Sequence, residues 1–332
     1  MNARVLIRWL ATIVIAVSAL IPLGLMLNPV AHARAATVRD WPGVLPPCNA
    51  SLQQCLDSTL VSSGDIIHIR PGVYTQSVTL YKAVSLIGDG PSVTTLNAPT
   101  RQRVLTVTGN LTFSTVISGI TFAGGDLIGS ICPEECGGGI LLSGPARPAL
   151  QNIVLRENTA WQGGGLWVDG GPEVVVVNSR IFSNSATEMG GGIYAATDVR
   201  LINTLIDHNQ SGITGGGLTV VGSLNVTNGS ILGNTSQSDG GGAYVSAGAT
   251  LNYGRWDGNT AAGSGGGLFA ASLNMTGTSF LNNVGGLYGG GAYLNGVAVM
   301  RDGQFVRNHA TGGGGAGGLY VGELHAVGTQ FI

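Results

Sequence analysis

The sequence predicts an all-β protein that folds as a right-handed parallel β-helix, a solenoid of about 25 residues per coil. Glycine triplets recur at a nearly constant interval, an asparagine recurs at the same interval, and large apolar residues hold fixed positions before each asparagine. The 56 glycines among 332 residues would otherwise suggest low complexity. Low-complexity sequence does not keep three columns in register, so the repeat is structural.

The glycine clusters define the coils. Successive triplets start 24 to 27 residues apart, and an imperfect copy follows at Ala316. The triplets start at Gly137, Gly163, Gly190, Gly215, Gly240, Gly265 and Gly289. At these turns we expect positive φ or a close backbone approach, either of which excludes side chains.

Two further columns share this interval. The asparagines are Asn158, Asn184, Asn209, Asn234, Asn259, Asn283 and Asn308. Three residues before each lies an apolar side chain: Leu155, Ile181, Ile206, Ile231, Trp256, Phe280 and Phe305. Stacked coils would place like residues above one another, so the apolar column fills the core and the asparagines form an internal amide ladder.

Alternating apolar residues after each glycine cluster predict short strands, with the first and third residues on one face. Leu166-Trp167-Val168 and Leu268-Phe269-Ala270 are examples. Such a coil cannot bury its apolar face alone, so we expect each strand to pair in parallel with its equivalent in the next coil.

The amino terminus predicts export. Arg4 and Arg8 precede an uncharged run over residues 10–27, and Ala31-His32-Ala33 supplies small residues at cleavage spacing, so residues 1–33 are predicted to be a signal peptide. The alternative is a retained membrane anchor, because the apolar run approaches the length of a spanning helix. Either way the chain is expected outside the cytoplasm, secreted or at the cell surface.

Residues 34–65 are predicted to be an amino-terminal segment with a capping helix, and residues 66–332 the β-helix, with regular glycine-rich coils over 137–332. Ser51 can cap a helix from Leu52 to Leu60 that plugs the open end of the core. Early strands are predicted at Ile66–Ile69, Val78–Leu80, Val84–Ile87, Val104–Val107 and Val116–Phe122. Residues 126–136 are predicted to be an inserted loop.

Two stretches resemble known families. Residues 51–90 resemble the amino-terminal segment of pectin-lyase-like β-helix proteins, with the sequence SLQQCLDSTLVSSGDIIHIRPGVYTQSVTLYKAVSLIGDG. The repeats, such as NSRIFSNSATEMGGGIYAA from Asn178, resemble those of bacterial surface proteins, including the chlamydial polymorphic outer membrane proteins. The resemblance implies the fold specifically, but it implies little about function, because this fold carries lyases, hydrolases, esterases and adhesins.

Composition restricts partners and cofactors. Without residues 1–33 the chain has 13 basic and 17 acidic side chains, which argues against nucleic acid as a partner. The cysteines form two close pairs, Cys48 with Cys55 and Cys132 with Cys136. For an exported chain these predict disulfides rather than a zinc site. Neither a metal nor a cofactor is expected.

Catalysis has weak sequence support. The acids are scattered, and the motifs of polygalacturonases are missing. The best remaining group is Asp207, His208 and Asp257, because both aspartates lie two residues before a column asparagine, two coils apart. Their expected separation of about 9.6 Å would suit an inverting hydrolase or a calcium ion. The alternative is solvated side chains beside a turn, which we favour.

A binding function has better support. The middle residues of the strands after the glycines form one column opposite the core, interrupted by Thr219: Trp167, Tyr194, Tyr244, Phe269, Tyr293 and Tyr320. Exposed, they would form a ribbon on which sugar rings or a partner surface could stack. The alternative is that the rings stack on one another, or lie under loops, and only stiffen the solenoid.

The sequence therefore favours an exported noncatalytic β-helix protein at the surface or outside the cell, in adhesion or glycan binding. The runner-up is a secreted polysaccharide lyase or glycoside hydrolase. A polysaccharide or cell-surface ligand is the expected partner, and contact with a membrane is expected only through the signal segment or a missing carboxyl-terminal anchor. Residues 328–331 restart the repeat just before Ile332, so we expect the chain to be incomplete.

Overall fold

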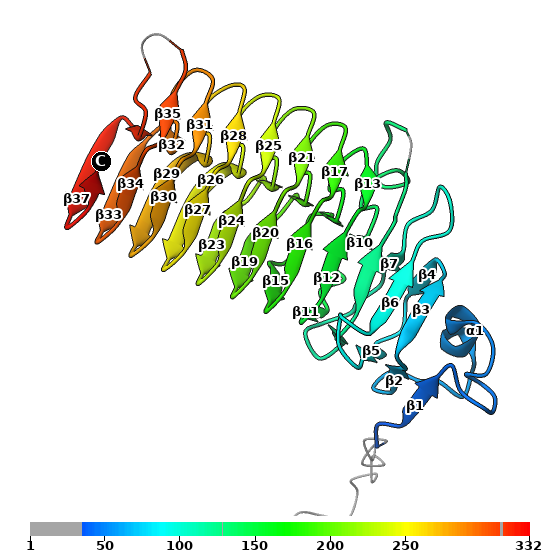
Figure 1. The fold of residues 1–332 in the computed structure, drawn as a ribbon. Helices are drawn as coiled ribbons and strands as arrows, with labels where there is room; N and C mark the ends of the chain where they lie inside the picture. Colours follow the sequence, from blue (N-terminus) through cyan, green and yellow to red (C-terminus); the bar gives the residue numbers. More distant parts are fainter. Residues whose placement is uncertain (1–34, 128, 313–314) are drawn as a thin grey trace, which may run out of the picture. The chain divides into compact units, whose positions relative to one another are not determined.

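The computed structural model describes residues 35–127, 129–312 and 315–332. The predicted signal peptide lies outside them. Over these residues the chain is a right-handed parallel β-helix of about 12 turns with one short helix, which confirms the predicted fold class (Figure 1). No helix in the described part is long and apolar enough to cross a membrane.

Each regular coil contains four short strands: two in a large sheet A, one in sheet B and one in sheet C. The first strand positions of sheet A are β4 Val78–Leu80, β7 Leu105–Val107, β10 Ile140–Leu142, β14 Leu166–Val168, β18 Ile193–Ala195, β22 Leu218–Val220, β32 Ala292–Leu294 and β36 Leu319–Tyr320. The second positions are β1 Val38–Trp41, β2 Ile66–Ile69, β5 Ser85–Gly88, β8 Val116–Ser118, β11 Ala149–Gln151, β15 Val174–Val177, β19 Val199–Ile202, β23 Leu224–Thr227, β33 Val297–Arg301 and β37 Glu323–Val327. In two coils one continuous strand spans both positions: β26 Ala243–Asn252 and β29 Leu268–Thr276.

Sheets B and C complete the coil. Sheet B contains β3 Gly72–Thr75, β6 Thr94–Asn97, β9 Thr121–Ala123, β12 Val154–Arg156, β16 Arg180–Phe182, β20 Leu205–Asp207, β24 Ser230–Leu232, β27 Arg255–Asp257, β30 Ser279–Leu281, β34 Gln304–Val306 and β38 Gln330–Phe331. Sheet C contains β13 Thr159–Ala160, β17 Ser185–Ala186, β21 Gln210–Ser211, β25 Thr235–Ser236, β28 Thr260–Ala261, β31 Val284–Gly285 and β35 His309–Ala310. Figure 1 shows equivalent strands side by side along the solenoid.

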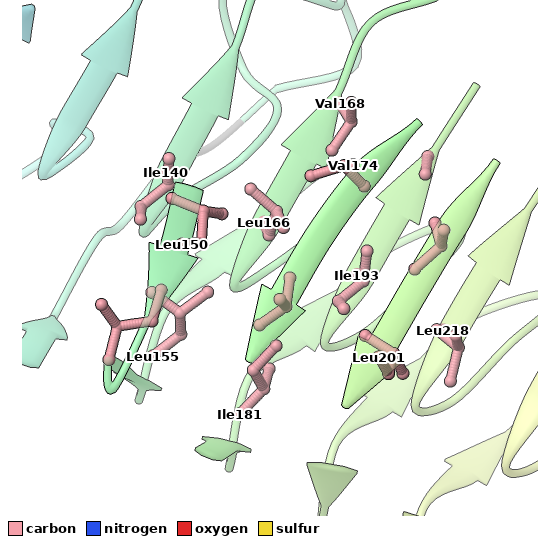
Figure 2. Close-up of a cluster of buried hydrophobic side chains, with 14 of the residues drawn as sticks. Ile140, Leu150, Leu155, Leu166, Val168, Val174, Ile181, Ile193, Leu201 and Leu218 are labelled. Atoms are coloured by element: carbon pink, nitrogen blue, oxygen red, sulfur yellow. The ribbon is translucent and has the colours of Figure 1, made fainter. Parts of the chain in front are cut away.

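The predicted register of the apolar column is confirmed. Leu155 pairs with Ile181, Ile181 with Ile206, and the column continues through Trp256 to Phe305. Every member is at most 1% exposed. Its aliphatic part joins the side chains of sheet A in one core (Figure 2). In its aromatic part Trp256 stacks on Phe280, and Phe280 on Phe305, with centroids 5.4 and 4.8 Å apart.

The predicted amide ladder is also present. From Asn158 to Asn283, each side chain donates its Nδ2 hydrogen to the Oδ1 of the next asparagine, over 2.8 to 3.0 Å. The same oxygen accepts the backbone N–H of the preceding asparagine. The residue before each asparagine has positive φ, as at His208 (54°), so its side chain is turned away from the core.

The glycine triplets satisfy two requirements. The first glycine has positive φ, 67° at Gly190. At the second, a side chain would meet the next coil: a Cβ on Gly191 would lie 2.3 Å from the carbonyl oxygen of Gly216. The triplet is therefore a close packing of backbones between coils rather than a ligand loop.

Three predictions for the amino-terminal region were wrong. β1 pairs in register with β2, so the β-helix begins before residue 66 and residues 34–65 are not a separate segment. The helix α1 covers Leu52–Asp57 rather than continuing to Leu60, because the backbone at Ser58 is no longer helical (ψ 139°). Lys82 Nζ donates to the carbonyl oxygens of Leu56 in the last turn and of Ser58 and Val61 beyond it. Leu60 is 59% exposed and does not plug the core.

Sequence reasoning also missed two early strands, β3 and β6, and the predicted strand over 116–122 is two strands, β8 and β9. Both cysteine pairs form disulfides. Cys48–Cys55 ties α1 to the preceding loop, and Cys132–Cys136 closes the inserted loop.

Candidate functional site

Asp207 is held as a structural carboxylate. It is 3% exposed and accepts two hydrogen bonds from Arg180, 2.9 Å from Nε and 2.7 Å from Nη2. His208 Nδ1 lies 3.0 Å from the same carboxylate. Burial raises the pKa of Asp207, but the hydrogen bonds from Arg180 and His208 outweigh burial, and the net shift is downward. A general acid needs a raised pKa, so Asp207 is unsuited to that role.

Asp257 does not join Asp207 in a site. The two occupy one column of sheet B, but Leu232 lies between them in the register. Asp257 contacts Arg255 and accepts a hydrogen bond of 2.9 Å from Asn282 Nδ2. Each carboxylate therefore has its own arginine, and neither is free to activate water. No group of His, Cys, Asp or Glu suited to a metal ion occurs among the described residues.

A charged cluster at the start of sheet A was not predicted. His68 on β2 lies between two carboxylates, with Nδ1 2.7 Å from Asp40 Oδ1 and Nε2 3.1 Å from Asp89 Oδ1. Arg70 also binds Asp40, over 2.9 Å. The imidazole fills the space that an inverting hydrolase leaves for water between its carboxylates, so the cluster is a clamp rather than an acid pair.

The clamp should make stability depend on pH. Hydrogen bonds to Asp40 and Asp89 raise the pKa of His68, and those from His68 and Arg70 lower that of Asp40. The contribution of His68 is then complete below its unfolded pKa of about 6.5 and disappears as pH rises through the folded value. The contribution of Asp40 to stability disappears only as pH falls through the lowered pKa of Asp40. The decrease in the thermal midpoint caused by His68→Gln should be larger at about pH 5.5 than at about pH 8. An equal loss at both would contradict the clamp.

The predicted aromatic column is in register and points away from the core. Trp167, Tyr194, Thr219, Tyr244 and Phe269 pair in succession, and the column continues through Tyr293 to Tyr320. The flanking residues of each strand, such as Leu268 and Ala270, are buried. The face was therefore predicted correctly, but its exposure was not uniform.

Trp167 is not available to a ligand. It is 7% exposed, because the disulfide loop packs over it and Cys136 and Leu141 contact it. Arg103 fixes that loop by donating to the carbonyl oxygens of Pro133, Glu134, Cys136 and Gly137. Tyr194 is part-buried beside Trp167, with centroids 6.2 Å apart. The predicted exposed ribbon is thus wrong for this end, where a loop remote in sequence covers it.

The part of the aromatic column that no loop covers is called here the aromatic ladder and consists of Tyr244, Phe269, Tyr293 and Tyr320. Consecutive centroids are 4.9 Å apart and the ring planes lie within 17° of parallel. Three rings are part-buried, and Tyr320 is 42% exposed. Tyr288, from the preceding turn and not predicted, lies 5.2 Å from Tyr320.

The ladder presents ring edges, partial faces and hydroxyls. Rings in contact at about 3.5 Å must be offset when their centroids are 4.9 Å apart, so each ring leaves part of its face uncovered. Within the described chain, the hydroxyls of Tyr244, Tyr288, Tyr293 and Tyr320 make no hydrogen bond to another protein group. Three of the four rungs therefore present a free hydroxyl beside apolar ring carbon, and Phe269 presents ring carbon alone.

No family model and no curated protein sequence matches the chain. Among solved structures, pectate lyase Pel9A is similar with a TM-score of 0.51 and 15% identity, over 81% of this chain and 72% of the lyase. The chain has the pectin-lyase-like β-helix fold. This likeness shows the fold alone. The resemblance of the repeats to polymorphic outer membrane proteins stays a prediction.

Two other solved structures match with lower TM-scores. The A-module of the Azotobacter vinelandii mannuronan C-5 epimerase AlgE6 has a TM-score of 0.46 and 14% identity, over 85% of this chain and 94% of the module. ORF18 of Geobacillus virus E2 has a TM-score of 0.47 and 13% identity, over 82% of this chain and 56% of the viral protein.

Proposed function

We propose that this chain is an exported, noncatalytic β-helix protein of the cell surface or extracellular space that binds a glycan along its aromatic ladder. The observation that carries the proposal is the ladder: four aromatic rungs on the outer face, spaced 4.9 Å, with tyrosine hydroxyls free of protein partners. Sugar rings offer apolar C–H faces beside hydroxyls, which suits a surface of aromatic ring carbon and phenol groups. Export rests on the sequence of residues 1–33.

The absence of an assembled acid pair favours binding over cleavage. Among the described residues, the two aspartates that sequence reasoning singled out are each held by an arginine. The pH-sensitive cluster around His68 lies at the opposite end of sheet A from the ladder. The two aspartates lie on sheet B, whereas Tyr293 lies on sheet A.

Replacing Tyr244, Phe269 and Tyr293 together by alanine should lower retention on an insoluble polysaccharide about tenfold or more, because each aromatic contact contributes about 0.5 to 1.5 kcal/mol. Affinity electrophoresis or depletion from solution measures the retention. Tyr253→Ala is the matched control, since Tyr253 is 65% exposed and lies outside the ladder. Circular dichroism should show an unchanged folded fraction. If the triple variant is retained as well as Tyr253→Ala, the ladder has a purely structural role.

A further inference from the structure

A second column on the outer face of sheet A runs parallel to the aromatic ladder. Asn225 on β23 pairs with Thr250 on β26, and Thr250 with Asn274 on β29. All three point away from the core, because their neighbours Leu251 and Met275 are buried. Tyr244 and Thr250 lie on one strand, as do Phe269 and Asn274, so the same coils carry both columns.

This column lines a hollow in the surface. A depression of about 390 Å³ is lined by Asn225, Thr250, Asn274 and Val299, together with residues of the bend between the two strand positions. A second depression, of about 640 Å³, shares Asn274 and Val299 and continues over β33 to β37. Together they form a trench along the solenoid axis, called here the amide trench.

Three polar side chains of the trench have no hydrogen-bond partner within the described protein. In the described structure, the side chains of Asn225, Thr250 and Asn274 make no hydrogen bond to another protein group. The buried asparagines of the same coils differ, since Asn234 and Asn259 are bonded on both sides. The trench therefore offers amide and hydroxyl groups to a ligand rich in hydroxyls.

The charge of the trench selects among glycans. No ionisable side chain lines the first depression, and only Arg301 and His325 line the second. His325 is already bonded to Glu323 over 2.9 Å. The one lysine, Lys82, is bound to carbonyl oxygens near α1, and the chain has a net charge of −2. A polyuronate would bring a carboxylate to each rung, whereas Arg301 at one end is the one arginine or lysine among the residues that line the trench.

The spacing of the trench selects the shape of the ligand. Neighbouring rungs of a parallel sheet lie about 4.8 Å apart, close to the repeat of an extended β-linked sugar chain. Asn225 and Asn274 are separated by one threonine rung, so two amides lie two coils apart in this column. In an extended β-1,4-linked chain the same groups face one side at every second sugar, which matches that alternation.

We propose that the amide trench binds a neutral, extended β-linked polysaccharide, with the chain lying parallel to the solenoid axis and one sugar facing each coil. The inference rests on the proposed glycan-binding function and names its ligand class. The trench supplies hydrogen bonds, while the ladder supplies apolar contact.

The test uses the full chain and four hexasaccharides: cellohexaose and chitohexaose, which are neutral and extended, hexagalacturonate, which is anionic, and maltohexaose, which is neutral but coiled. Isothermal titration should show binding of at least one of the first two, and weaker or no binding of the others. The variant Asn225→Ala, Thr250→Val, Asn274→Ala should weaken that binding about tenfold. Gln237→Ala removes an exposed amide outside the trench and should leave it unchanged.

Three outcomes would overturn the inference, and they are distinguishable. Tighter binding of hexagalacturonate, or of maltohexaose, would refute the ligand class while leaving glycan binding intact. Loss of binding on replacing Tyr293 but not the three trench residues would place the glycan on the ladder alone. If the wild-type chain binds none of the hexasaccharides and no insoluble polysaccharide, the proposed function fails together with the trench.

Discussion

Replacing Asn234 by alanine is expected to lower the free energy of unfolding by about 3 kcal/mol. Its side chain is completely buried and makes four hydrogen bonds: its oxygen accepts from the backbone and side chain of Asn209, and its Nδ2 donates to Ile206 and Asn259. Alanine would leave the Asn209 backbone N–H without an acceptor in a dry core. Each buried polar group left unpaired costs about 1 to 3 kcal/mol.

The matched control is Asn225→Ala. This asparagine belongs to the same coil, lies on the outer face and makes no hydrogen bond within the described protein. Its replacement should change the free energy of unfolding by less than about 0.5 kcal/mol. Denaturant unfolding measures both variants. Equal effects would mean that the amide ladder contributes nothing beyond an ordinary surface asparagine.

Trp256 should respond very differently to two substitutions. It is completely buried and stacks on Phe280, so Trp256→Ala should cost about 3 to 5 kcal/mol by creating a cavity. The indole Nε1 is buried without a hydrogen-bond partner. Phenylalanine removes that unpaired donor and matches Phe280 and Phe305 in the same column, so Trp256→Phe should cost much less.

Thermal or denaturant unfolding of the two Trp256 variants distinguishes the explanations. A small loss for phenylalanine and a large one for alanine supports an apolar stack with an unsatisfied donor. A large loss for both would show that the indole N–H contributes to stability, for example through a buried water molecule.

The regular coils could be predicted from sequence because parallel stacking places equivalent residues above one another. Once one interval is known, every column from Leu155 to Phe305 follows, as do its asparagines and its outward aromatic residues. A one-residue shift would have turned every strand over, and three independent columns exclude it.

What escaped prediction depends on contacts between remote or irregular segments. β1, β3 and β6 lie before the regular repeat, so Asp40 could not be paired with His68 from spacing. The loop that buries Trp167 is an insertion, and a repeat says nothing about where an insertion folds. Asp207 and Asp257 have the expected two-coil separation, but the arginines that neutralise them are visible only in the structure.

The most direct test of a noncatalytic glycan-binding protein is to incubate the chain with neutral and uronate polysaccharides, with and without calcium, and to measure bound protein and soluble products together. We expect retention that depends on the aromatic ladder, with no new reducing ends and no unsaturated products. Release of either product, at a rate that falls when Asp207 is replaced by asparagine, would contradict the account and identify an enzyme.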